Sequence, residues 1–481
     1  MNFILFNPDE WRGESVGCNG HPLAPTPHLD ELAAQGVRFE QCHVQHPVCT
    51  PSRCSFMTGW YPHVRGHRTL WHCLRPDEPN LLRSLKQNGY EVRWFGKNDL
   101  LSPGSFASSV TSAESRGGGM FGPNPYAPGD PAFHSFLYEP YAGPVERHGD
   151  YANVQAAVDF LQSGPTRPFC LYLPLSFPHC PYSAPPPWHD LVDPAALPPL
   201  RPVGADKPDF HDLIRRTRRL DELPDEHFRR LQAVYLGMIG FTDMLLGRLL
   251  AALEETGLDR DTAVLVFSDH GDWAGDYGLV EKWPSALDDC LTRVPFVIRA
   301  PGGAAGHVVR EPVELFDMMA TVLELAEVRA QHTHFARSLV PQLQGAAGDP
   351  TRAVFAEGGY ARHEPHCFEG RSDDNAALWA NPEHIYYPKG KLQQDHPESV
   401  CRATMVRTQQ HKLVYRTDGM CELYDLEQDP RELRNRHGDP AYAEVQSALE
   451  RRLLAWLTET SDVTPWEPDP RGLPPREGGS V

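Results

Sequence analysis

The run of residues 262–267, Thr-Ala-Val-Leu-Val-Phe, most constrains the fold of this chain, because it carries no charged side chain. A strand that is apolar along its whole length is covered on both faces, which is typical of the parallel sheets of α/β proteins. Residues 2–6 form a second apolar run that stops before Pro8. We therefore expect an α/β domain with a large mixed, mostly parallel sheet flanked by helices, and residues 226–256 have the spacing of a core helix.

Acidic side chains follow both of these predicted strands. Asp9 and Glu10 come after the first strand, and Asp269 and His270 come after residues 262–267. Open α/β sheets bind ligands at the carboxyl ends of their strands, and a carboxylate that is buried there needs a partner. On their own, Asp9 and Glu10 are better explained as solvated acids in a turn. Together with Asp269 and His270, they suit a hard divalent cation.

The segment Cys49-Thr50-Pro51-Ser52-Arg53 places a cysteine and an arginine four residues apart, where a helix is expected to begin. Proline is tolerated in the first turn of a helix. The helix dipole and the free N–H groups at such an end favour a bound anion, and an arginine one turn later reaches the same point. The simple alternative is a buried structural cysteine.

Other polar residues also lie directly after predicted strands. Lys97 and Asp99 follow one strand, His179 stands between two prolines after the next, and Lys282 comes thirteen residues after Asp269. A histidine held between prolines suits a preorganised hydrogen-bond donor. The two strands concerned are expected at residues 90–95 and 169–175.

Taken in order, these motifs resemble the type I sulfatases of the alkaline-phosphatase superfamily, and the resemblance extends from Asp9 to Asp429. The Cys-x-Pro-x-Arg segment at 49–53, closed by Thr58-Gly59, resembles the motif whose cysteine is oxidised to formylglycine. In that family the hydrated aldehyde of formylglycine is the nucleophile. The resemblance implies an alkaline-phosphatase-like fold and a sulfuric ester hydrolase that converts a sulfate monoester to an alcohol and inorganic sulfate.

The resemblance also implies the residues of the site. One divalent metal ion is expected, calcium ahead of manganese and magnesium, and its ligands would be Asp9, Glu10, Cys49 as formylglycine, Asp269 and His270. The groups that act on the sulfate ester would be Cys49, Arg53, Lys97, Asp99, His179 and Lys282. The implied partners are a small-molecule or saccharide sulfate ester and a formylglycine-generating enzyme.

Two residues depart from the family pattern. Glu10 stands where an aspartate or an amide is usual, and Asp99 stands where many sulfatases carry a histidine that helps to release sulfate. Phosphonate monoester and phosphodiester hydrolases share the nucleophile and lack that histidine, so they are an alternative, although they generally lack the lysine as well. Lys97 therefore favours a sulfatase. A non-catalytic member that binds sulfated ligands is a third hypothesis.

The net charge of −19 argues against nucleic acid or an anionic membrane as a partner. The eleven cysteines show no paired spacing, and we find no signal peptide and no stretch long enough to span a membrane. These features predict a cytoplasmic protein with reduced thiols. The sequence leaves the oligomeric state open, a homo-oligomer included.

A change to polar, irregular sequence after about residue 365 predicts two domains, a catalytic domain at 1–365 and a smaller C-terminal domain at 366–481. Strands are expected at 403–408, 411–417 and 422–426, with a hairpin turn at Asp418-Gly419. A helix is expected at 441–458. The smaller domain is therefore predicted to be an α+β unit with an antiparallel sheet. Residues 102–131, rich in Ser, Gly and Pro, are expected to be an irregular lid.

Overall fold

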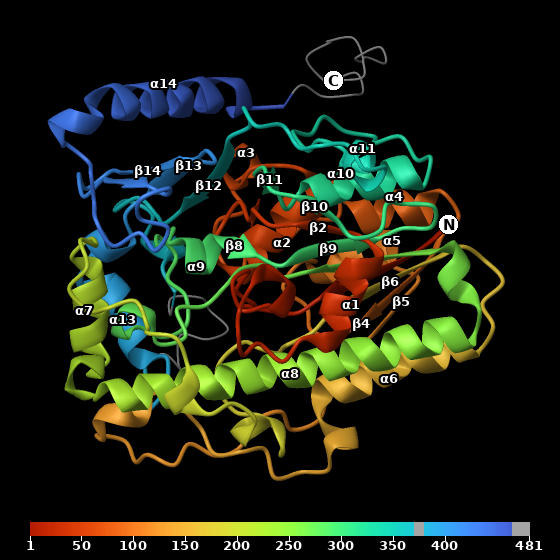
Figure 1. Cartoon of the computed structure of the whole chain (residues 1–481), viewed down its shortest axis with the longest axis horizontal. Coiled ribbons are helices and arrows are strands. Elements are labelled where there is room, and N and C mark those ends of the chain that lie inside the picture. Colours follow the sequence, from red (N-terminus) through yellow and green to blue (C-terminus); the bar gives the residue numbers. More distant parts are fainter. Residues whose placement is uncertain (370–379, 464–481) are drawn as a thin grey trace.

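The computed structural model describes residues 1–369 and 380–463 of the chain, and its centre is a mixed sheet (Figure 1). In this described part the sheet has eight strands in the order β10-β2-β9-β7-β1-β6-β4-β5. Their bounds, in that order, are His307–Val309, Val37–Phe39, Phe296–Arg299, Thr262–Phe267, Asn2–Asn7, Phe169–Pro174, Glu91–Phe95 and Ser112–Glu114. The predicted α/β fold with a large mixed sheet is confirmed.

The three central strands of this sheet run parallel. β1 pairs with β6 on one side and with β7 on the other, so that Phe6 lies opposite both Leu173 and Val266. β9 is antiparallel to β7 and to β2. Because β1, β6 and β7 share one direction and one register, their carboxyl ends lie side by side at the same edge of the sheet.

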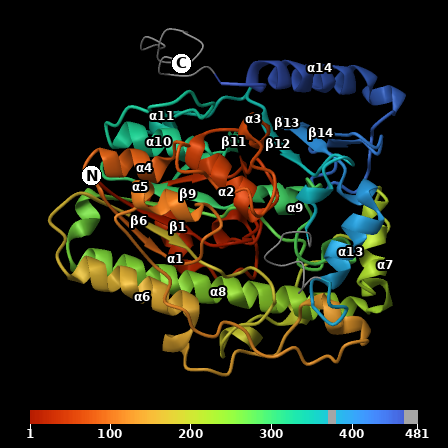
Figure 2. The same ribbon diagram turned by 180° about the vertical axis from the view of Figure 1, so that it is seen from behind.

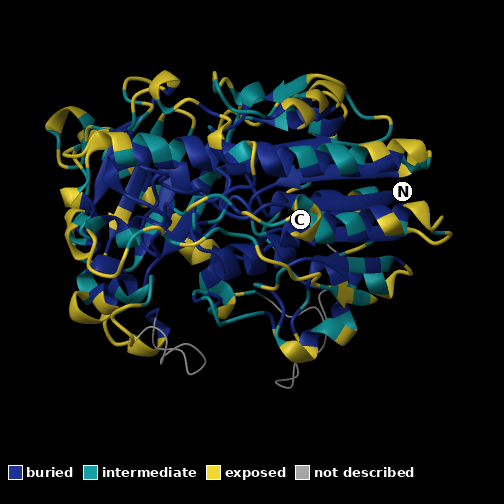
Figure 3. Ribbon diagram, turned by 90° about the horizontal axis from the view of Figure 1, so that it is seen from below, coloured by how far each residue is buried: buried dark blue, intermediate teal, exposed yellow. Residues whose placement is uncertain are grey.

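Helices cover both faces of the sheet, as the fully buried strands require (Figures 1 and 2). Phe3 and Leu5 pack on one face against α2, Cys49–Thr58, α4, Leu81–Gln87, and α10, Asp317–Leu325. Ile4 and Phe6 point to the other face, against α1, Pro27–Gln35, α6, Gly149–Gln162, and α8, Asp225–Glu255. The strands are buried in the middle of the molecule in Figure 3.

Helix α8 corrects one expectation. By length and composition it is apolar enough to cross a membrane, so the expectation that no stretch of the chain reaches this length is wrong. However, 78% of its apolar window is buried inside the protein. Its buried residues pack on the sheet and on α6, as in a core helix.

The C-terminal region forms a four-stranded antiparallel sheet, as expected, in the order β12-β13-β14-β15. Helix α14, Ala443–Thr460, packs on this sheet, and its Trp456 ring stacks on Phe355 with the centroids 4.9 Å apart. Strand β12 comes before the predicted domain boundary, which itself stays a prediction. The strands are Val354–Gly358, Ala403–Arg407, His411–Arg416 and Glu422–Asp425.

The segment 102–131 is more regular than expected. Within it, β5 pairs in parallel with β4 and forms an edge of the main sheet. Its sequence, Ser-Ala-Glu, has no apolar pattern because the edge strand is only partly covered. The expectation of an irregular insertion is therefore wrong for this strand. The remaining short elements are α3, Pro62–Arg65, α5, Phe106–Ser109, α7, Phe210–Thr217, α9, Asp289–Thr292, α11, Val340–Leu343, α13, Tyr387–Asp395, β3, Cys42–His43, β8, Arg293–Val294, and β11, Val313–Glu314.

Candidate active site

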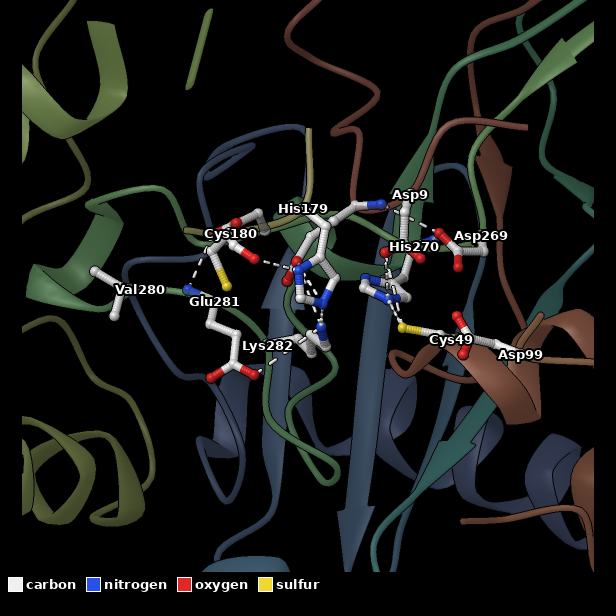
Figure 4. Close-up of polar contacts among 12 residues, drawn as sticks. Asp9, Cys49, Asp99, His179, Cys180, Asp269, His270, Val280, Glu281 and Lys282 are labelled. Atoms are coloured by element: carbon white, nitrogen blue, oxygen red, sulfur yellow. Dashed lines mark hydrogen bonds and ion pairs between the residues drawn. The ribbon is translucent and has the colours of Figure 1, made fainter. Parts of the chain in front are cut away.

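The site is assembled at the carboxyl ends of the three central strands (Figure 4). Asp9 follows β1, His179 follows β6, and Asp269 follows β7. The fourth contribution comes from α2, which begins at Cys49 after an extended residue, Val48. Cys49 is therefore the first residue of its helix, close to the free N–H groups of the first turn.

Five buried side chains, here called the inner cluster, comprise Cys49 and four neighbouring residues. The Sγ atom lies 3.1 Å from Nε2 of His270 and 3.7 Å from Oδ1 of Asp9. Arg53 bridges the two carboxylates, with Nη2 2.7 Å from Asp9 and Nε 2.8 Å from Asp269. No member is more than 3% exposed. The inner cluster consists of Asp9, Cys49, Arg53, Asp269 and His270.

Hydrogen bonds to the backbone fix the orientation of the β7 end. The N–H groups of Glu10 and His270 both donate to Oδ1 of Asp269, at 3.1 and 3.0 Å, and the Ser52 hydroxyl donates to the Asp269 carbonyl at 2.5 Å. Nδ1 of His270 lies 2.9 Å from the carbonyl oxygen of Gly271. Because a carbonyl oxygen only accepts, Nδ1 carries a proton, and Nε2 is the ring nitrogen that faces Cys49.

These donors fit a divalent cation. The ligand atoms of Asp9, Cys49, Asp269 and His270 all lie within 4.8 Å of one another and are buried. Burial raises the pKa of Asp9, but the positive charges of Lys97 and Arg53 outweigh it and hold that pKa well below its usual value. Two carboxylates with one imidazole nitrogen are a usual donor set for such ions. The chemistry of the set does not distinguish calcium from manganese or magnesium.

Five further polar residues, here called the outer cluster, lie next to the inner one. Lys97 contacts Asp9, and its Nζ lies 2.7 Å from Asp99. Lys282 contacts Nε2 of His179, and its Nζ lies 3.3 Å from Oε2 of Glu10. The side chains of Lys97, Asp99 and His179 are 26%, 29% and 20% exposed, so this side of the site is open to solvent. The outer cluster consists of Glu10, Lys97, Asp99, His179 and Lys282.

The sequence groups Glu10 with the metal ligands, but the structure places its carboxylate in the outer cluster. Its Oε2 lies 3.5 Å from His179 as well as near Lys282, and Oε1 is buried with no hydrogen-bond partner among the described residues. The φ angle of Glu10 is +68°, a left-handed conformation. Its role as a metal ligand stays a prediction.

The protonation of two groups limits the chemistry of the site. Burial, together with the Asp9 charge, raises the pKa of the Cys49 thiol, so that an unmodified cysteine is a neutral thiol and a weak nucleophile. Burial and the Lys282 charge lower the pKa of His179 to about 3, so its imidazole is neutral at pH 7. Nδ1 of His179 donates to the Cys180 carbonyl at 2.5 Å, and Nε2 therefore accepts from Lys282.

All ten residues predicted for the site lie in these two adjoining clusters, while their chemical roles stay predictions. Sequence reasoning missed two buried carboxylates that hold the surrounding loops. Asp150 accepts the N–H groups of Ser176 and Phe177 at 2.9 and 2.8 Å. Asp272 accepts the Tyr182 hydroxyl at 2.7 Å. Its place in the Asp-His-Gly-Asp string after β7 was a signal that could have indicated it.

The chain matches two protein-family models. The model described as sulfatase matches residues 1–328, and the model described as N-sulphoglucosamine sulphohydrolase, C-terminal, matches residues 371–459. The first match includes every residue of both clusters.

Known proteins resemble the chain over nearly its whole length. The multifunctional alkaline phosphatase superfamily protein PehA of Trinickia caryophylli is 26% identical over 99% of this chain and 99% of its own. An ulvan-active sulfatase of Formosa agariphila is 27% identical over 96% of this chain and 82% of its own. The crystal structure of a phosphonate monoester hydrolase of Agrobacterium radiobacter shares the fold, with a TM-score of 0.77, 22% identity and coverage of 99% and 100%.

Proposed function

The chain belongs to the sulfatase family of sulfuric ester hydrolases, and from this premise we propose that it hydrolyses a sulfate monoester to an alcohol and inorganic sulfate at Cys49. One observation carries the proposal. Cys49 is the first residue of α2, and its sulfur lies beside the donors for a metal ion, one of which, Asp9, also contacts the cations of Arg53 and Lys97. That position suits a nucleophile that meets an anionic ester.

We further propose that Cys49 is converted to formylglycine by a formylglycine-generating enzyme. The neutral, buried thiol is poorly suited to attack an anion, because negative charge at sulfur is disfavoured beside Asp9. Formylglycine would supply an aldehyde hydrate, whose hydroxyl is the nucleophile. A divalent cation held by Asp9, Asp269 and His270, calcium ahead of manganese and magnesium, would supply Lewis acidity to the nucleophile and the ester oxygen.

The cationic side chains bind the sulfate group in this proposal. Nη1 of Arg53 is buried without a hydrogen-bond partner among the described residues, and it remains as a donor for an ester oxygen. Lys97 contacts Oδ2 of Asp9, the same oxygen that Arg53 binds. Lys282 donates one N–H to the neutral His179 and one to Glu10, and in this proposal its third N–H is the donor for the leaving oxygen. Such preorganised donors stabilise charge that develops in the transition state.

We propose a saccharide or small-molecule sulfate ester as the substrate, with no nucleic acid or membrane partner. The name of the ulvan-active relative supports the saccharide class. All eleven cysteines are free in the structure, which agrees with reduced thiols and with a cytoplasmic location. Homo-oligomers are compatible with this proposal.

Hydrolysis of phosphonate monoesters or phosphodiesters is the second candidate. Asp99 favours it, because an acid pairs with Lys97 where many sulfatases carry a histidine. The same nucleophile and the same metal donors would serve both reactions, so the clusters alone do not separate them. A non-catalytic protein that binds sulfated ligands is the remaining alternative.

The test begins with the mass of the tryptic peptide that contains Cys49, from protein produced together with a formylglycine-generating enzyme. We expect the mass of the aldehyde. The modified protein is then assayed with an aryl sulfate and an aryl phosphonate ester, and we expect a higher kcat/KM for the sulfate. A higher value for the phosphonate would favour the second candidate, and an unmodified thiol without turnover of either ester would contradict both enzymatic functions.

A further inference from the structure

Four buried charged side chains form a cluster directly behind the outer cluster, centred on Glu281. Arg218 Nη2 lies 2.6 Å from Oε2 of Glu281, and Lys389 Nζ lies 2.7 Å from Oε1. Lys389 also pairs with Glu369 at 3.0 Å. No side chain of the four is more than 2% exposed. The two carboxylates and the two cationic side chains therefore compensate one another's charge in a region that excludes water.

This cluster is adjacent to Lys282 in the chain and in space. Nζ of Lys282 lies 4.0 Å from Oε1 of Glu281, the same oxygen that Lys389 binds at 2.7 Å. Lys282 instead contacts His179, as Figure 4 shows, and it also donates to Glu10. The Glu281 carboxylate is therefore a competing partner for the lysine that the proposed reaction uses.

The backbone holds Glu281 in place, so side-chain charges decide which partner Lys282 takes. Its φ angle is +67°, and its N–H donates to the Tyr182 hydroxyl at 3.0 Å and to Asp272 at 3.1 Å. Its carbonyl accepts the Trp273 N–H at 3.1 Å. The carboxylate itself is charged, because Lys389, Arg218 and Lys282 outweigh the effect of burial and lower its pKa.

A buried carboxylate that loses one cation is strongly attracted to the next, because attraction is strong where water is excluded. Without Lys389, the ammonium within 4.0 Å of Oε1 among the described residues is that of Lys282. We propose that Lys389 is a positioning residue, which pairs with Glu281 and thereby leaves Lys282 free to face His179 and the bound anion. The effect on turnover rests on the proposed function, whereas the placement of Lys282 does not.

The test uses Lys389→Met in the full-length, formylglycine-containing protein. We expect kcat/KM for an aryl sulfate to fall about 100-fold, because moving a catalytic group such as the Lys282 ammonium by about 1 Å can lower the rate by that factor. In a crystal structure of the variant, Lys282 Nζ should have moved from His179 to Glu281. Lys389→Gln gives the same comparison if the Met variant does not fold.

A second substitution separates positioning from a general loss of structure. In Lys389→Met/Glu281→Gln no carboxylate remains at residue 281 to attract Lys282, so we expect kcat/KM to return to within about fivefold of the wild-type value. Lys412→Met is the matched control. Lys412 is equally buried and pairs with Asp289 at 3.0 Å and with Glu432, so its loss should lower stability without lowering kcat/KM.

The inference is overturned if Lys389→Met keeps the wild-type kcat/KM or if the double variant does not regain it. It is also overturned if Lys412→Met lowers kcat/KM as much as Lys389→Met does. Failure of the proposed function gives a different result. If the wild-type protein hydrolyses no ester, the crystal structures of Lys389→Met and Lys412→Met still decide the inference through the position of Lys282.

Discussion

The inner and outer clusters share the same strand ends but differ in exposure and in how their charges are compensated. In the inner cluster every side chain is essentially buried, and Arg53 alone bridges Asp9 and Asp269. In the outer cluster Lys97, Asp99 and His179 keep a fifth or more of their surface exposed. Charges buried without water depend on their partners, whereas exposed charges are screened. The inner cluster should therefore couple activity to stability, whereas the three partly exposed residues of the outer cluster should affect activity with little effect on stability.

The largest expected effect is the loss of the nucleophile. Cys49→Ala should lower kcat by about 10⁴-fold or more, because removal of a covalent nucleophile is rarely compensated. The Cys49 sulfur carries no charge in the fold, so the melting temperature should change little, which makes this substitution the exception within the inner cluster. The kinetics of a purified variant and a thermal unfolding curve measure both quantities. A variant that retained turnover near the wild-type rate would contradict the proposed mechanism.

Asp269→Asn tests whether metal binding and stability depend on the same side chain in the inner cluster. The substitution removes one charged donor from the metal site and leaves Arg53 with a single carboxylate partner in a solvent-free environment. We expect most bound divalent metal to be lost and the free energy of unfolding to fall by about 3 kcal/mol. Elemental analysis and denaturant unfolding in the presence of a chelator separate the two effects. Unchanged metal content would show that the metal ion binds elsewhere.

Lys97→Met provides the corresponding test in the outer cluster. Arg53 continues to pair with Asp9 when the ammonium is removed, and Lys97 is partly exposed. We expect kcat/KM to fall about 10- to 100-fold through weaker binding of the anion, while the free energy of unfolding changes by less than about 1 kcal/mol. A loss of stability as large as that of Asp269→Asn would remove the distinction between the clusters.

The sequence predicted the members of both clusters better than their arrangement. Asp9 and Asp269 could be found because apolar runs mark strands, and parallel strands must place their following residues at one edge, whereas Cys49 could be found through its Cys-x-Pro-x-Arg segment. The direction of the Glu10 side chain could not be predicted from the sequence, because this residue has a left-handed backbone conformation that is uncommon for a non-glycine residue.

Contacts between segments that are distant along the chain also could not be predicted from the sequence. Lys389 lies more than 100 residues from Glu281, in the polar, irregular stretch of sequence that follows residue 365. Strand β5 was missed because its partly exposed Ser-Ala-Glu sequence has no apolar alternation. In both cases tertiary packing, and not local pattern, determines where the residues lie.

The smallest expected effect concerns Asp99, and it decides whether the outer cluster selects the substrate by charge. Its carboxylate is 2.7 Å from Lys97 and is ionised, because Lys97 and Arg53 outweigh burial and lower its pKa. This negative charge opposes a dianionic phosphate ester more than a monoanionic sulfate ester. In Asp99→Asn we therefore expect the ratio of kcat/KM for an aryl phosphate to that for an aryl sulfate to rise about fivefold.

The matched control for Asp99→Asn is Glu91→Gln, on β4, the strand that Lys97 and Asp99 follow. Glu91 is similarly exposed and pairs with Arg93 at 3.5 Å, so its removal changes the net charge by the same amount away from the site. An equal shift in both variants would mean that the overall field of this acidic protein, and not the outer cluster, sets the preference. A shift in Asp99→Asn alone would place the selection at the exposed side of the site. The inner cluster would then provide the proposed nucleophile and metal donors for sulfate and phosphate esters alike.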